Sequence, residues 1–207
     1  ILGIISSFSL PPHSFFFINF ITFPLLLIFF ISNYKKSRFV SFSIGWIFGF
    51  GYFISSLYWL THSLTFDETF KPLIPFALIL IPSFLGIFYG IGTLVCSLFR
   101  LNNKISTILI FSLIFGLVEY LRGFILGGFP WNLIVFSLTE YLPMIQILSF
   151  IGTYSLNLLL INIFLIPSVI FFQYTKIKKI ILIFLSLILI FLNFLYGSFV
   201  IKKDYSI

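Results

Sequence analysis

Long apolar runs separated by short charged clusters set the pattern of this chain. Residues 1–34 carry no charge, and neither do the 28 residues of 39–66, the 28 of 72–99 and the 35 of 141–175. A helix that rises 1.5 Å per residue needs about 20 apolar residues to cross roughly 30 Å of hydrocarbon. The pattern therefore predicts an all-α fold: a polytopic transmembrane helix bundle of about seven spans, with the first one partial.

Prolines and charges divide this pattern into the predicted spans. Pro11-Pro12 ends the first span, because proline removes a backbone donor and biases the residue before it to extended geometry. The chain opens at Ile1 without a Met, so we expect the true N-terminus to lie upstream. Gly45 and Gly49 form a G-x-x-x-G pattern, which predicts close approach of a neighbouring helix. The remaining spans are expected at about 14–32, 39–66, 72–99 and 105–124, within 141–175, and at 180–197.

Charges alternate between two kinds of loop. Three loops are purely basic, and the loops between them hold all five acids of the chain. The positive-inside rule places the purely basic loops in the cytoplasm, and therefore the other loops and the C-terminus outside. The basic loops carry Lys35/Lys36/Arg38, Arg100/Lys104 and Lys176/Lys178/Lys179, and the others carry Asp67/Glu68/Lys71, Glu119/Arg122/Glu140 and Lys202/Lys203/Asp204.

The composition excludes a soluble fold. Of 207 residues, 60% are hydrophobic and 8% charged, with a mean hydropathy of +1.20, whereas about a quarter of residues are charged in ordinary soluble domains. The net charge of +7 does not indicate a nucleic-acid partner, because the cations sit in short clusters between apolar spans. The expected surroundings are a lipid bilayer.

One stretch, residues 119–131, combines an acid and a base with a helix-breaking sequence. Glu119 and Arg122 are three residues apart, so they share a helix face and can pair. Only 14 uncharged residues precede Glu119, so this helix must continue to about residue 124 to cross the membrane. The pair is either a structural lock between helices or a contact for a lipid phosphate, which arginine suits well.

Aromatic residues near this end of the bundle suggest a membrane interface. Gly128, Phe129, Pro130 and Trp131 form either the apolar floor of a lipid site or an interfacial anchor, and Tyr58 and Trp59 suit an aromatic belt.

No catalytic constellation can be assembled from the sequence. Cys96 lies inside an apolar span, and His13 and His62 have no acidic neighbours in sequence. No phosphate-binding loop or metal-ligand spacing is present, so we expect no catalytic residue, cofactor or metal in this chain.

The motifs resemble bacterial apolipoprotein N-acyltransferase. That family carries a Glu-Trp-Leu-Arg-Gly run, a short apolar spacer and Gly-Phe-Pro-Trp in its membrane domain, and the resemblance covers about residues 3–200. Here the runs read Glu119-Tyr120-Leu121-Arg122-Gly123 and Gly128-Phe129-Pro130-Trp131, flanked by Tyr58-Trp59 and Gly152-Thr153-Tyr154. Tyr120 departs from the usual Trp.

The resemblance implies a transferase that moves an acyl chain from a phospholipid to the lipid-modified N-terminal cysteine of an apolipoprotein. It implies a multi-pass protein of the inner membrane whose functional face is periplasmic. Residues 1–201 would be the transmembrane domain and 202–207 the start of a linker to a nitrilase-like catalytic domain that this chain lacks. The motif residues would then shape the lipid mouth.

Two other functions remain open from the sequence. One is a non-catalytic membrane scaffold or lipid-binding remnant of such an enzyme. The other is a small transporter, although apart from Glu119 and Arg122 the spans hold no acid or cation at mid-span.

Overall fold

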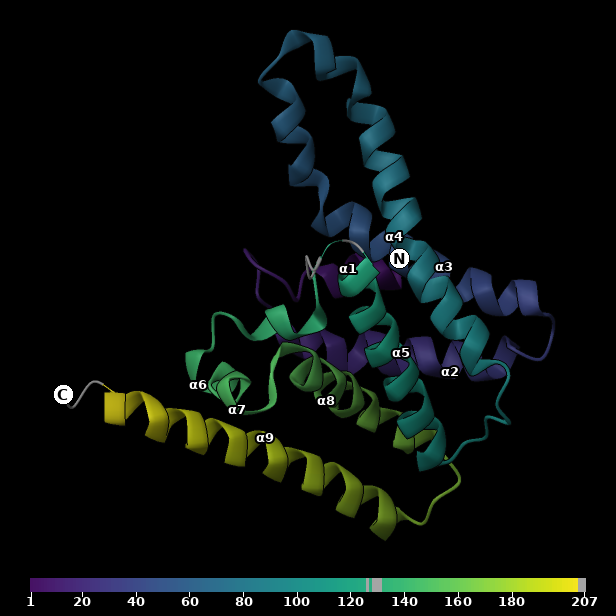
Figure 1. Cartoon of the computed structure of the whole chain (residues 1–207). Helices are drawn as coiled ribbons and strands as arrows, with labels where there is room; N and C mark the ends of the chain where they lie inside the picture. Colours follow the sequence, from purple (N-terminus) through teal and green to yellow (C-terminus); the bar gives the residue numbers. More distant parts are fainter. Residues whose placement is uncertain (126, 128–131, 205–207) are drawn as a thin grey trace.

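The computed structural model describes residues 1–125, 127 and 132–204, and every regular element within those ranges is helical (Figure 1). The α-helices are α1 (Leu2–Ser7), α2 (Asn19–Asn33), α3 (Arg38–Ser56), α4 (Ile74–Cys96), α5 (Ile105–Ile125), α6 (Leu142–Ile145), α7 (Leu148–Ile151), α8 (Thr153–Leu165) and α9 (Lys176–Asp204). Short 3₁₀ helices join them: η1 (Phe16–Ile18), η2 (Tyr58–Thr65), η3 (Glu68–Leu73), η4 (Ile134–Leu138) and η5 (Ile166–Phe171). The predicted all-α bundle is confirmed.

Six helical segments within the described ranges are long and apolar enough to cross a membrane. They match the second to seventh predicted spans, while the region of the first span holds the six-residue helix α1. The prediction for residues 141–175 is also confirmed, because α6 and α7 lead into a spanning helix. The six segments are Phe16–Asn33, Arg38–Ser56, Glu68–Cys96, Ile105–Ile125, Thr153–Phe171 and Lys176–Lys203.

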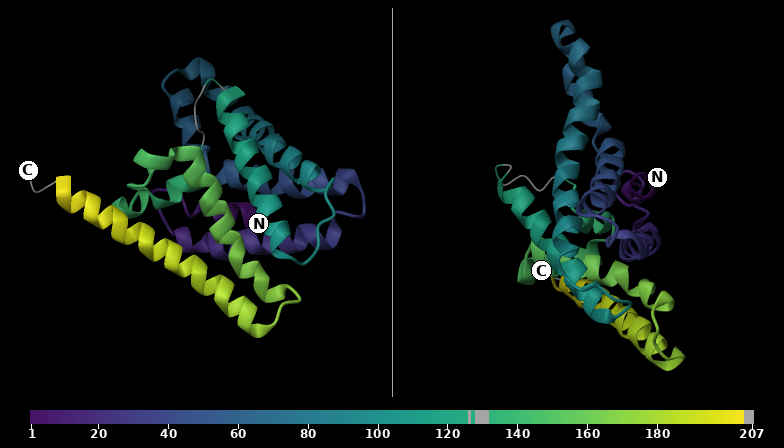
Figure 2. Two further views of the ribbon diagram at one scale, coloured as in Figure 1. Left: turned by 60° about the horizontal axis from the view of Figure 1, so that its bottom comes forward. Right: turned by 90° about the vertical axis from the view of Figure 1, so that its right-hand side faces the viewer.

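The span predicted over residues 39–66 is wrong at its end. The α-helix stops at Ser56, and η2 follows as one leg of a hairpin that projects from the bundle (Figures 1 and 2). Hydroxyl groups explain the tighter winding: the Thr61, Ser63 and Thr65 side chains each donate to the carbonyl three residues earlier, at 2.6–2.7 Å. Such bonds offer the backbone an alternative to regular α-helix.

We call this hairpin, residues 58–73, the arm. Asp67 separates its two 3₁₀ legs and begins η3, because its carboxylate accepts a hydrogen bond from the Thr69 amide at 2.9 Å. That bond lowers the pKa of the Asp67 carboxyl. The second leg then continues into α4 without a break in helical structure.

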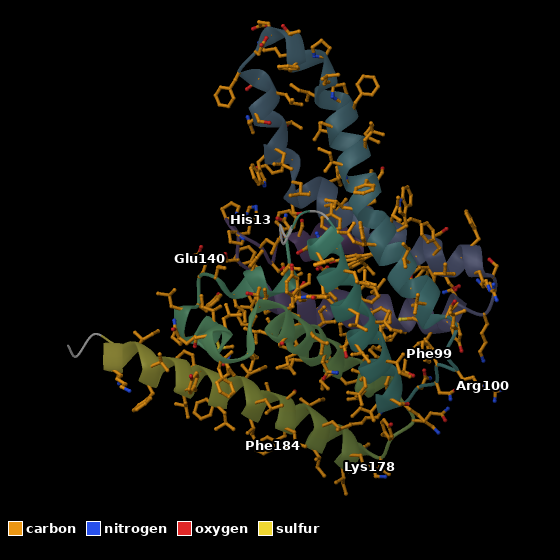
Figure 3. All side chains as sticks on the ribbon, in the orientation of Figure 1. His13, Phe99, Arg100, Glu140, Lys178 and Phe184 are labelled. Atoms are coloured by element: carbon orange, nitrogen blue, oxygen red, sulfur yellow. The ribbon has the colours of Figure 1, made fainter. Side chains whose placement is uncertain are left out.

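The two kinds of loop lie at opposite ends of the bundle. Arg100 and Lys178 lie together at one end, and His13 and Glu140 lie at the other (Figure 3). We refer to these as the basic end and the opposite end. The structure therefore separates the loops as the charge alternation requires, and the side of the membrane that each faces stays a prediction.

Helices α3 and α4 pack through glycine. A Cβ atom placed on Gly45 would lie 2.2 Å from the Tyr89 carbonyl oxygen, and one on Gly49 would lie 3.0 Å from the Gly86 Cα. Only the absence of a side chain permits such contact between helix backbones. The predicted role of the G-x-x-x-G pattern in close helix approach is confirmed.

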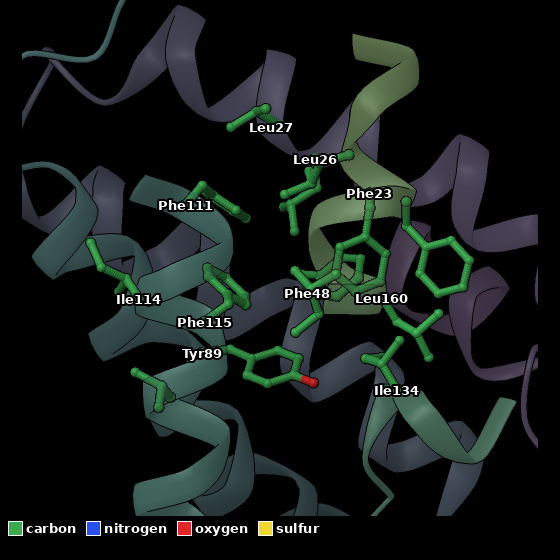
Figure 4. Packing of buried hydrophobic residues seen from close by; sticks show 14 of the residues in the cluster. Phe23, Leu26, Leu27, Phe48, Tyr89, Phe111, Ile114, Phe115, Ile134 and Leu160 are labelled. Atoms are coloured by element: carbon green, nitrogen blue, oxygen red, sulfur yellow. The ribbon is translucent and has the colours of Figure 1, made fainter. Parts of the chain in front are cut away.

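Aromatic rings fill the centre of the bundle. Phe111 and Phe115 of α5 stack with their centroids 4.3 Å apart, and the Tyr89 ring packs against Phe48 and Phe115 from neighbouring helices (Figure 4). The last helix, α9, lies at the edge of the bundle with most of its large apolar side chains exposed (Figure 2). These packed rings form a scaffold on which the C-terminal end of α5 is held.

Candidate functional site

The ion pair predicted from the sequence is present and fully buried. Arg122 Nη2 donates to Glu119 Oε2 within α5, and neither side chain has any exposed surface. As predicted, α5 continues past the pair, to Ile125, so the charges occupy its last two turns. A charge buried this deeply at the end of a span needs partners on the neighbouring helices.

Helices α3 and α4 supply those neighbours. The Arg122 guanidinium carbon lies 5.1 Å from the centroid of the Phe53 ring, within the range of a cation–π contact. Tyr52 of α3 and Tyr89 of α4, both buried, pack against the same Phe53 ring, with centroid distances of 5.3 and 5.5 Å. The pair therefore joins α5 to two other helices rather than facing the lipid.

The hydrogen bonding of the pair is incomplete within the described part of the chain. Arg122 Nε and Nη1 and Glu119 Oε1 are buried and have no hydrogen-bond partner there. Buried charged groups without partners are costly, so these three atoms are the points at which a water molecule or a ligand atom would gain most. In this conformation the guanidinium is closed off from solvent, and its contact with a lipid phosphate stays a prediction.

The opposite face of the same motif packs on α8. The Tyr120 and Tyr154 rings meet edge to face with centroids 5.2 Å apart. A Cβ atom on Gly123 would lie 2.0 Å from the Tyr154 hydroxyl oxygen, which explains the glycine after Arg122. The Glu-Tyr-Leu-Arg-Gly run thus holds α5 against three helices at once.

Asn132 is a residue that the sequence analysis missed. The Tyr52 hydroxyl donates to the Asn132 carbonyl oxygen at 3.1 Å, and Asn132 Nδ2 donates to the Ser56 carbonyl oxygen at 3.2 Å. Its φ of +42° is one that asparagine tolerates better than most residues, and this preference was the available sequence signal. The two bonds fasten the chain after α5 to the end of α3. The predicted site residues Gly128, Phe129, Pro130 and Trp131, which precede Asn132, lie outside the described residues.

Tyr58 and Trp59 lie apart from the buried pair, at the base of the arm. They are 57% and 52% exposed and line a cavity of about 470 Å³ together with His13. This cavity is at the opposite end of the bundle, where an aromatic belt would be expected. The structure therefore brings Glu119 and Arg122 together but places the two belt residues in a separate site.

The remaining reactive groups of the described residues do not form a second centre. Cys96 is buried at the end of α4 next to the basic end. Within residues 1–125, 127 and 132–204, no three His, Cys, Asp or Glu side chains lie close enough together to hold a metal ion.

The fold and the buried Glu119–Arg122 pair define a class of protein. It is a polytopic helical membrane protein with a buried ion pair at the end of a central span. Comparison with known proteins is more specific. The family described as apolipoprotein N-acyltransferase N-terminal domain matches residues 2–166. The chain belongs to this family.

Relatives named apolipoprotein N-acyltransferase are similar over most of the chain. The protein of Rhizobium rhizogenes is 34% identical over 174 residues, that of Rhodopseudomonas palustris 36% over 173, and that of Brucella melitensis 30% over 174. These alignments cover 80–81% of this chain and 32% of each relative. The chain thus spans about a third of the length of the curated relatives it matches.

Proposed function

We propose that this chain supplies the membrane domain of an apolipoprotein N-acyltransferase. In the proposed reaction an acyl chain moves from a phospholipid to the amino group of the S-diacylglyceryl-cysteine at the N-terminus of a lipoprotein. The single observation that carries the proposal is the match to the N-terminal domain of that family over residues 2–166. The buried Glu119–Arg122 pair, which ties three spans together at one end, supports it as a built feature of such a domain.

In this proposal the protein lies in the bacterial inner membrane with its opposite end in the periplasm. The separation of basic loops from acid-bearing loops supports that orientation. Residues 1–201 form the transmembrane domain, and residues 202–207 begin a linker to a catalytic domain outside this sequence. The chemical step is then carried out by residues beyond 207.

The motif residues are proposed to shape the entrance through which lipids reach that catalytic domain. Glu119 and Arg122 hold α5 against α3 and α4, and so fix the wall of the entrance. Tyr58 and Trp59 are exposed in their own cavity at the same end of the bundle, where amphipathic rings favour the interface between acyl chains and headgroups. The proposed contribution of Gly128, Phe129, Pro130 and Trp131 is to the same entrance.

Complementation of a strain depleted of its own N-acyltransferase tests the proposal. The chain alone is expected to fail, and the chain continued by its downstream reading frame is expected to restore growth and triacylated lipoprotein, measured by mass spectrometry of the N-terminal peptide. Failure of the continued chain, expressed at normal levels in the membrane, would refute the proposal and favour the non-catalytic scaffold.

A further inference from the structure

The cavity beside Tyr58 and Trp59 has the composition of a binding site. Its two walls come from distant parts of the sequence: the loop after α1, and the end of α3 with the start of the arm. A volume of about 470 Å³ is within the range of small-molecule sites in proteins. The walls include Phe8, Pro12 and His13 on one side and Ser55, Tyr58 and Trp59 on the other.

Four polar side chains on these walls carry a hydrogen-bond donor for which the described residues supply no acceptor. The side chains of His13, Ser55, Tyr58 and Trp59 make no hydrogen bond to any other described residue. Each carries an N–H or O–H group. A ligand that fits this arrangement presents several acceptor oxygen atoms close together.

The charges of the lining residues restrict the chemical class of the ligand further. None of the described lining residues is Lys, Arg, Asp or Glu, so the site offers no formal counter-charge to a phosphate or a carboxylate. The other lining residues are the serines Ser7 and Ser56 and an apolar set: Phe8, whose ring centroid lies 4.9 Å from that of His13, Pro11, Pro12 and Ile54. The ligand is therefore an uncharged group with acceptor oxygens that continues into hydrocarbon.

We propose that this cavity binds the glycerol-ester region of a diacyl lipid. Tyr and Trp gather at the level of the membrane where apolar chains meet polar headgroups, and ester carbonyls are uncharged acceptors at that level. The donors of His13, Ser55, Tyr58 and Trp59 bind those carbonyl oxygens, and the apolar wall contacts the first methylene groups. The inference rests on the proposed function and adds to it the part of the lipid that is recognised.

The two histidines of the chain provide a direct test. His13 lines the cavity, whereas His62 lies in the arm outside it, and both are exposed. The chain in an alkyl maltoside detergent, which contains no ester, is treated with diethyl pyrocarbonate, and modification of each histidine is followed by mass spectrometry. Dioleoylglycerol at about four times its Kd leaves one fifth of the sites empty and should slow His13 modification about fivefold, with His62 unchanged.

Two further lipids identify what is recognised. A dialkylglycerol ether of the same chain length lacks the carbonyl oxygens and should give little protection of His13. A dioleoyl phospholipid should protect as well as dioleoylglycerol, because the two share the glycerol-ester region. Equal protection by the ether, equal slowing of His62, or protection by the phospholipid alone would each overturn the inference.

A pair of tryptophan variants locates the effect. Trp59→Phe keeps an aromatic ring, smaller than the indole, but removes the indole N–H, and should weaken protection of His13. Trp46→Phe is the control, since the Trp46 indole donates to the Ser83 carbonyl oxygen at 3.0 Å in the α3–α4 contact. Unchanged protection in Trp59→Phe would remove this residue from the site. Because no acyl transfer is measured, a negative result here leaves the outcome of complementation unaffected.

Discussion

Substitution of Arg122 by methionine should destabilise the protein strongly. The change keeps much of the apolar stem but removes the guanidinium, which leaves Glu119 buried without a counter-charge. Breaking a fully buried pair in this way costs about 3–5 kcal/mol. The lost contact with the Phe53 ring, at 5.1 Å, adds about 0.5–2 kcal/mol.

The expected effect is large enough to measure as a melting temperature in detergent. The two costs together come to about 3.5–7 kcal/mol, and a chain of this size loses about 2–4 °C per kcal/mol, so Arg122→Met should melt roughly 7–28 °C below the parent protein. The assay is size-exclusion chromatography after heating, with a fluorescent tag to follow the folded fraction. Glu119→Gln combined with Arg122→Met removes both charges and should recover much of the loss.

The chain contains a matched control with the same spacing. Lys71 and Glu68 also pair across three residues, at 2.5 Å, but their side chains are 45% and 86% exposed. Glu68→Gln should cost no more than about 1 kcal/mol, because exposed pairs contribute little. Two outcomes would show that the buried Glu119–Arg122 pair does not hold α5 against α3 and α4. One is equal melting temperatures for Arg122→Met and Glu68→Gln, and the other is a double variant as unstable as Arg122→Met.

Three other predictions follow from the packing and the charges. Gly45→Ala should lower the melting temperature through a cost of about 1–3 kcal/mol, because the new methyl group meets a backbone carbonyl. Gly92→Ala, where the nearest side-chain atom is 3.5 Å away, should be neutral or stabilising by up to about 1 kcal/mol. Gly123→Ala should lower the melting temperature in the same assay, because the new methyl group would clash with the Tyr154 hydroxyl oxygen. Adding Tyr154→Phe removes that oxygen and should partly restore the melting temperature. A C-terminal alkaline phosphatase fusion should be active and a fluorescent protein fusion dark, whereas the reverse would invert the predicted orientation.

Much of the fold could be predicted because lipid imposes simple demands on a sequence. A span must be long and apolar, so the charges at Arg100 and Lys104 and at Lys176 mark where helices end and begin. The same rule required α5 to continue past Glu119. The arm escaped prediction because residues 57–66 are uncharged like a span, and the choice of 3₁₀ winding depends on local hydroxyl bonds.

The candidate site was predictable only where its contacts are local in sequence. Glu119 and Arg122 pair within one helix, so their spacing is sufficient to place them together. The bonds of Asn132 to Tyr52 and Ser56 connect residues 80 and 76 apart, respectively, and no periodicity indicates such contacts. His13 likewise reaches the Trp59 cavity only through the tertiary fold.

The continuous helical segment from Glu68 to Cys96 makes the height of the arm depend on bilayer thickness. Its apolar α-helical part, α4, has 23 residues and extends about 34 Å at 1.5 Å per residue, beyond roughly 30 Å of hydrocarbon. A segment with this positive hydrophobic mismatch tilts more in a thin bilayer and less in a thick one. The distance of Asp67, at the turn of the arm, above the headgroups would therefore vary with the length of the surrounding acyl chains.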